Sequence, residues 1–144
     1  MTAFDPVKGR GPEIARFDVD QALDVNVENL ICALSPDGTR LATASGSNSP
    51  IKIYSLRGHS VTTIPAKGLD RLWNVTWAAD EKGLYVGRHV ADGTELLYLD
   101  FKGRSSHLWK SLGQKCFGVP SPDGRHLAIY DWKRSANMWM IENF

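Results

Sequence analysis

Hydrophobic residues occur along this chain in short runs that are interrupted by Gly, Ser, Asn and Asp. β-Branched and aromatic residues are frequent in these runs, and several runs alternate apolar with polar side chains, which is typical of β-strands. The first group of runs predicts four strands, over residues 29–34, 40–45, 51–56 and 60–64. The pattern therefore predicts an all-β fold made of short antiparallel strands.

The same succession of runs returns twice further along the chain. The second group predicts strands over residues 72–77, 84–87, 95–101 and 106–109, and the third over residues 115–119, 126–130 and 137–141. Upstream of all three groups, residues 13–19 alternate and predict one further strand. Residues 1–11 contain Pro6, Gly9 and Gly11 and are expected to form a loop.

A turn motif recurs between the first two strands of each group. Ser35-Pro36-Asp37-Gly38 returns as Ser121-Pro122-Asp123-Gly124, and Leu41, Leu84 and Leu127 follow at a spacing of 43 residues. Gly38 and Gly124 are expected to have positive φ, as this turn chemistry requires. The middle copy has Glu81 and Lys82 in the turn and its glycine, Gly83, comes late, which predicts a longer or differently shaped turn there.

A repeat of this length has two common interpretations, propeller blades of four strands and helical solenoids. Ser-Pro-Asp-Gly would break a helix in every copy, so the propeller is favoured. The repeats resemble the WD40-like repeats of bacterial TolB-type β-propellers, and the resemblance covers about residues 29–144. It implies about three blades, over residues 29–66, 69–111 and 114–144. Residues 136–144 also resemble the end of propellers attached to bacterial signalling proteins such as serine/threonine kinases.

Three blades cannot close a ring alone, and an open stack exposes the apolar faces of its first and last blades. The third group lacks a fourth strand, while the strand over residues 13–19 is spare. We expect this strand to complete the last blade of a second copy, so that two chains form a six-bladed homodimer. The alternative is that the chain belongs to a longer propeller.

The charge and cysteine content narrow the functional classes. The formal net charge is +1, which gives no electrostatic basis for binding nucleic acid or a membrane. The first residues lack the apolar run of a signal peptide. Cys32 and Cys116 fall in the first strands of different blades, so we expect two buried free thiols rather than a disulfide, which suits a cytoplasmic location.

The candidate chemical groups do not form a catalytic pattern. The four histidines, His59, His89, His107 and His126, lack a nucleophile partner, and no metal-ligand spacing or phosphate-binding loop is found. Asp37, Asp80 and Asp123 are expected to cap their own turns and to lie far apart. The sequence therefore predicts a protein that is not an enzyme and needs no cofactor.

The best candidate for a binding site is the face of the propeller formed by the loops after the second and fourth strands of each blade. Trp132 lies beside Lys133 and Arg134 in such a loop, whereas Trp73, Trp77 and Trp139 are expected to pack in the blades. Candidate partner-binding residues on this face are Trp132, Arg134, Arg71, His89 and Asp92. We expect an interaction or sensor module for a protein or peptide, as the C-terminal part of a bacterial signalling or regulatory protein. The alternatives are the propeller part of a prolyl-oligopeptidase-type peptidase and a fragment without independent function.

Overall fold

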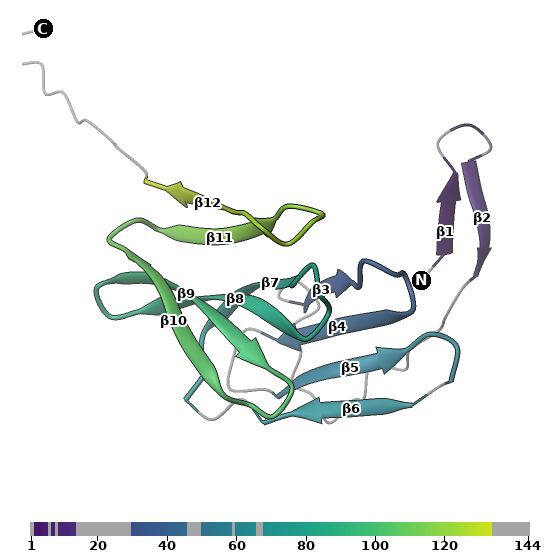
Figure 1. Ribbon diagram of the computed structural model, residues 1–144, viewed down its shortest axis with the longest axis horizontal. Coiled ribbons are helices and arrows are strands. Elements are labelled where there is room, and N and C mark those ends of the chain that lie inside the picture. Colours follow the sequence, from purple (N-terminus) through teal and green to yellow (C-terminus); the bar gives the residue numbers. More distant parts are fainter. Residues whose placement is uncertain are drawn as a thin grey trace, which may run out of the picture.

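The computed structural model describes residues 2–5, 7, 9–13, 30–45, 50–58, 60–65 and 68–133. These residues form twelve strands, all paired antiparallel, in two sheets of four strands and two of two (Figure 1). No helix occurs among them, so none of the described segments is a helix that could cross a membrane. The all-β prediction is confirmed for the described residues.

The first four-stranded sheet contains β3 (Leu30–Leu34), β4 (Arg40–Ser45), β5 (Ile51–Ser55) and β6 (Val61–Ile64). The strands lie side by side in chain order, so each pairs with the one before it. Their bounds agree with the predicted runs to within one or two residues. Short polar connections between alternating runs leave consecutive strands as neighbours, which explains this meander.

The second four-stranded sheet repeats this order with β7 (Leu72–Trp77), β8 (Gly83–Val90), β9 (Gly93–Asp100) and β10 (Ser105–Ser111). β8 and β9 are longer than predicted because they continue to a tight turn at Ala91 and Asp92. β11 (Lys115–Pro120) and β12 (Leu127–Trp132) form a two-stranded sheet. The predicted strand over residues 137–141 lies outside the described residues.

The two four-stranded sheets and the β11–β12 sheet stack on one another through their first strands. β3 and β4 pack against β7, and β11 packs against β7, β8 and β9 (Figure 1). The buried core lies between the two four-stranded sheets and includes Ala42, Ile53, Val75, Trp77, Leu84, Val86 and Leu97. The described strands form an open stack, and the number of blades and the closed ring stay predictions.

The N-terminal residues differ from the prediction of a loop over residues 1–11. β1 (Thr2–Asp5) and β2 (Gly9–Glu13) form an antiparallel hairpin in which Asp5 pairs with Gly9. Gly9 has a φ of 80°, a conformation that lets a short hairpin turn close. The spare strand predicted over residues 13–19 has only its first residue, Glu13, within the described part of the chain.

The three turns that join the first two strands of each repeat have the same shape. In each turn two backbone hydrogen bonds recur, for example from the Gly38 N–H to the Ser35 carbonyl and from the Gly124 N–H to the Ser121 carbonyl. Gly38 and Gly124 have φ values of 69° and 68°, which confirms the prediction for both.

The prediction of a different middle turn is wrong. The Glu81 N–H donates to the Ala78 carbonyl as the glycines do in the other copies, and Glu81 itself adopts a φ of 57°. Gly83 is not the turn glycine. It stands where a Cβ would lie 2.5 Å from the ring of Tyr98, so close approach of that ring accounts for the glycine.

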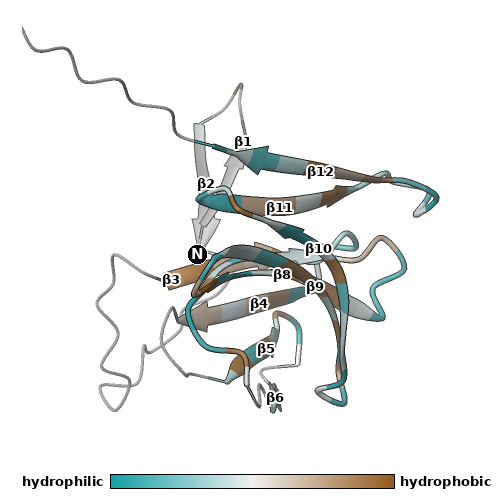
Figure 2. Ribbon diagram, turned by 90° about the vertical axis from the view of Figure 1, so that its left-hand side faces the viewer, coloured by the Kyte–Doolittle hydropathy of each residue, from teal (hydrophilic) through white to brown (hydrophobic). Residues whose placement is uncertain are grey.

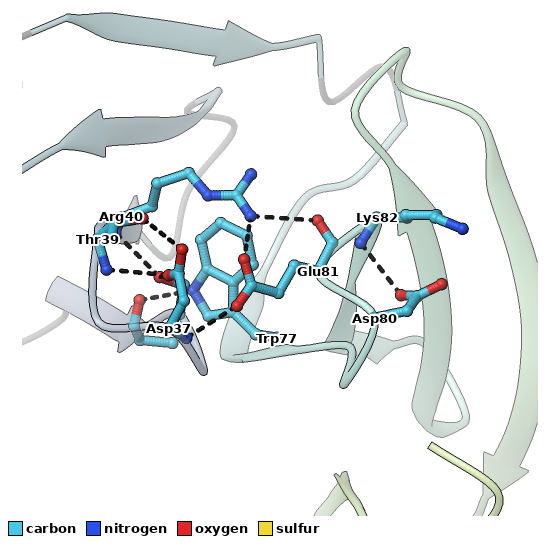
Figure 3. A network of polar contacts seen from close by, with 9 residues as sticks. Asp37, Thr39, Arg40, Trp77, Asp80, Glu81 and Lys82 are labelled. Carbon is cyan, nitrogen blue, oxygen red and sulfur yellow. Dashed lines mark hydrogen bonds and ion pairs between the residues drawn. The ribbon is translucent and has the colours of Figure 1, made fainter. Parts of the chain in front are cut away.

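Contacts of Glu81 with the preceding turn offset its unfavourable backbone (Figure 3). Its carboxylate accepts hydrogen bonds from the Arg40 guanidinium at 2.5 Å and from the Asp37 backbone N–H at 2.8 Å. The Arg40 guanidinium lies 4.6 Å from the Trp77 ring centroid, and the Trp77 indole N–H donates to the Ala33 carbonyl. The first two turns are therefore joined directly, through Glu81 and Arg40 rather than through their aspartates, whose carboxylates cap their own turns.

The two ends of the stack expose apolar side chains. On β3, Leu30, Cys32 and Leu34 are exposed, Leu34 at 51%, while Ile31 and Ala33 between them pack against the core. Figure 2 shows β3 as a strand of hydrophobic residues. At the other end Val119, Ile129 and Tyr130 are exposed. The prediction that both cysteines are buried free thiols is therefore wrong for Cys32, since no described segment covers its side of β3, and holds for Cys116.

Candidate functional site

Several of the predicted binding residues meet at one end of the stack. The turns over residues 35–38, 78–81 and 121–124 lie together at one end of the strands, which we call the turn end. The opposite end, the loop end, carries Arg71 before β7, His89 near the end of β8, Lys115 at the start of β11 and Trp132 at the end of β12. The strand directions thus bring residues that are 61 positions apart in sequence to one surface.

Lys115 lies at the centre of this surface. Its ammonium nitrogen is 5.8 Å from the ring centroid of Trp73 and 5.9 Å from that of Trp132. Both distances are within the range of cation–π attraction. We call Arg71, Trp73, His89, Lys115 and Trp132 the Lys115 cluster.

Strand pairing and sheet packing place the aromatic rings of the cluster around Lys115. Lys115 and Trp132 are direct partners in the β11–β12 pair, and the Gln114 N–H donates to the Trp132 carbonyl at 2.9 Å. Trp73 comes from the neighbouring sheet and approaches β11 because Gly87 has no side chain. A Cβ at Gly87 would lie 2.9 Å from both the Trp73 ring and the Cys116 carbonyl oxygen.

Aromatic packing continues from the cluster along β11 and β12. The rings of Trp73 and Phe117 meet edge to face at 5.9 Å, and Phe117 stacks on Tyr130 at 4.8 Å. Tyr130 and Trp132 remain 52% and 44% exposed. The loop end therefore presents rigid aromatic surface beside positive charge, which is the composition of residues that contribute most to protein binding.

His89 is held against this cluster by its neighbours. Its ring lies 6.3 Å from the Trp73 ring, and its backbone N–H donates to the Arg71 carbonyl at 3.1 Å. Burial, followed by the charges of Arg71 and Lys115, lowers the pKa of His89 below its ordinary value. The imidazole is therefore uncharged at neutral pH and acts as an aromatic and hydrogen-bonding group.

Two local features of the Lys115 cluster are unfavourable in themselves: a strained backbone and a buried polar atom without a hydrogen bond. Arg71 has a φ of 53°, which is unfavourable for a residue with a side chain, and such residues are frequent at binding sites. The buried indole nitrogen of Trp73 has no hydrogen-bond partner among the described residues.

The structure brings three of the five predicted site residues together. Arg71, His89 and Trp132 belong to the Lys115 cluster. Asp92 lies in the β8–β9 turn and is paired with Lys110 of β10 at 2.8 Å, a partner outside the cluster. Arg134, like the loop over residues 46–49, lies outside the described residues.

Sequence reasoning missed Trp73 as a site residue because it assigned this strand residue to the core. Trp77, four residues later, is buried as expected at 3% exposure. Trp73 lies instead at the loop end and is only partly buried. The sequence near Trp73 could not indicate this position at the binding surface, because Lys115 approaches Trp73 only when β11 stacks on the second sheet.

The cluster combines positive charge with aromatic surface. Its polar groups are two cations and a neutral imidazole, and no carboxylate orients His89 in the contacts described above. In the described part of the chain no three His, Cys, Asp or Glu side chains come together as metal ligands. Comparison with known protein families and with curated proteins finds no match for this chain.

Proposed function

We propose that this protein is a non-enzymatic interaction module of propeller-type blades that binds a protein or peptide segment at its loop end. The observation that carries the proposal is the position of Lys115 between the rings of Trp73 and Trp132 on an exposed surface. A stack of sheets holds these groups rigidly, so a partner need not order them on binding.

The chemistry of the cluster favours a peptide that carries an acidic residue beside an apolar one. Arg71 and Lys115 offer charged donors to a carboxylate, which makes stronger hydrogen bonds than neutral donors make. The exposed face of Trp132 offers contact area to the apolar side chain. A carboxylate next to His89 also favours its protonated form, so binding is expected to tighten as the pH falls toward the lowered pKa of free His89.

The resemblance of the repeats to TolB-type propellers supports a role as the C-terminal part of a bacterial signalling or regulatory protein. Cys32 and Cys116 are free thiols, which supports the proposal of a cytoplasmic location. The exposed apolar ends of the stack support the two-copy ring, in which the first sheet of each copy covers the last sheet of the other.

Selection of displayed random peptides on the immobilised protein tests the binding function. Peptides with an acidic residue beside an aromatic or aliphatic one are expected to be enriched. Trp132→Ala and Lys115→Met should each lower the affinity for the best peptide by about tenfold or more. Trp109→Ala is the matched control, because Trp109 is equally exposed at 45% but lies on β10, outside the cluster.

Two outcomes would contradict the proposal. If no peptide is enriched, or if Trp109→Ala reduces binding as much as Trp132→Ala does, the Lys115 cluster is not the binding site.

A further inference from the structure

A pocket of about 370 Å³ opens at the turn end of the stack, away from the Lys115 cluster. It lies between the second sheet and the β11–β12 sheet. The middle turn contributes Ala78, Ala79 and Asp80, the last turn contributes Pro122, Asp123 and Gly124, and Tyr85 and Tyr98 complete the lining. Its volume is in the range of sites for small ligands or single side chains of a partner.

The internal repeat shows what fills the corresponding place one repeat earlier. At the junction of the first two turns, Arg40 extends between the turns and binds Glu81 with its guanidinium. The same guanidinium lies over the rings of Trp77 and Phe101, at 4.6 and 5.7 Å from their centroids. It also contributes to the low pKa of Asp37, after the hydrogen bonds from Ser35 and Thr39.

At the second junction the repeat places different residues at these positions. The residue 43 positions after Arg40 is Gly83, and the residue 43 positions after Glu81 is Gly124. Position 83 therefore supplies no counterpart of the Arg40 guanidinium at this junction. The place between the turns remains open as the pocket, and Asp80 and Asp123 line it in place of the missing Glu81 counterpart.

The lining carries the groups that recognise a guanidinium. Asp80 and Asp123 provide carboxylates from two turns, and the rings of Tyr85 and Tyr98 meet edge to face at 5.8 Å. No lining residue carries a positive charge. Burial, followed by the charge of Asp80, raises the pKa of Tyr98, so the ring stays a neutral phenol.

Asp80 is also less engaged within its own turn than its counterparts are. Asp37 and Asp123 each accept a hydrogen bond from the serine two residues before, Ser35 or Ser121. Ala78 stands at this position in the middle turn, so that bond is missing there. Figure 3 shows Asp80 on the other side of the turn from Glu81, which reaches back to Arg40.

We propose that this pocket binds the guanidinium group of an arginine side chain from a partner peptide. Asp80 and Asp123 accept its N–H groups, and Tyr85 and Tyr98 contact its planar face, as Trp77 and Phe101 contact Arg40. The site is independent of the Lys115 cluster and adds a second contact point at the opposite end of the strands.

Titration with N-acetyl-argininamide, followed by NMR of the backbone amides, tests the proposal. Saturable shifts are expected at residues 78–80 and 122–124. The citrulline analogue, which has the same shape without the charge, should bind at least about tenfold more weakly. Equal shifts with both compounds, or shifts away from the pocket, overturn the proposal.

Variants distinguish an effect on the pocket from an effect on the fold and from an effect on binding at the loop end. Asp80→Asn with Asp123→Asn should remove argininamide binding, and Tyr85→Leu, which leaves both turns intact, should weaken it. Asp37→Asn is the matched control, because it makes the same change in the turn that does not line the pocket. Trp132→Ala should bind argininamide normally. Unchanged binding in both the double variant and Tyr85→Leu also overturns the proposal.

Discussion

At the scale of single residues, the middle turn shows how a tertiary contact replaces a local preference. Glu81 adopts the left-handed conformation that glycine adopts in the other two turns, which costs about 1 kcal/mol for a residue with a Cβ. Its carboxylate gains a partly buried ion pair with Arg40 and a hydrogen bond from Asp37. The sequence could not show this, because the compensating partner lies 41 positions earlier.

Substitution of Glu81 separates the backbone cost from the ion pair. Both Glu81→Ala and Glu81→Gly lose the contacts with Arg40, but only glycine adopts a φ of 57° without strain. The glycine variant is therefore expected to be more stable than the alanine variant by about 1 kcal/mol in urea unfolding. Lys82 is the control: it has no positive φ, so Lys82→Gly should be less stable than Lys82→Ala. The same order at both positions would refute the strain at Glu81.

The pKa of Asp37 predicts how the free energy of unfolding changes at low pH. Hydrogen bonds from the Ser35 hydroxyl, and then from the Thr39 hydroxyl and N–H, lower its pKa from 3.8 to about 2. A carboxyl group whose pKa is lower in the folded state stabilises the fold above its unfolded pKa. That contribution is lost as the pH falls from 3.8 toward 2. Asp37→Asn should therefore lose less stability than the parent chain across this window, as measured by urea unfolding at several pH values. Equal losses would contradict the low pKa.

At the scale of elements, the sequence predicted what depends on local patterns. Residues 72–77 alternate and carry Trp and Val, and β7 has these bounds. The turns at Gly38 and Gly124 follow from Ser-Pro-Asp-Gly alone. The β1–β2 hairpin was missed because its composition, with Pro6 and Gly9, is also that of a loop. The Lys115 cluster was predicted only in part, because its contacts depend on how one sheet stacks on the next.

Substitution of Gly87 tests how β11 stacks on the second sheet. A Cβ there would lie 2.9 Å from the Cys116 carbonyl oxygen and from the Trp73 ring, which are held by β11 and β7. Gly87→Ala should therefore destabilise the protein by about 1–3 kcal/mol, as other overpacked cores show. Gly58→Ala, whose Cβ would meet only the flexible Ser55 side chain at 3.3 Å, should change stability much less. Unfolding in urea compares the two, and equal effects would show that β11 does not pack on β8 as described.

At the scale of the whole molecule, the stack exposes apolar side chains at both of its ends. Leu34 is 51% exposed on the first sheet and Val119 is 51% exposed on the last. In the proposed two-copy ring each of these faces is buried against the other chain. A charge within the contact should therefore be strongly unfavourable, and Leu34→Asp is expected to shift the protein toward the monomer. Leu108→Asp, at an equally apolar exposed position on β10 of the second sheet and thus at neither end of the stack, is the control and should leave association unchanged.

The mass of the purified chain in solution tests the two-copy ring most directly. Light scattering is expected to give twice the 16.0 kDa of one chain, at concentrations where Leu34→Asp gives the mass of a single chain. A parent chain that remains folded with a mass of 16.0 kDa would show that its apolar ends are not covered by a second copy, and the ring would be ruled out.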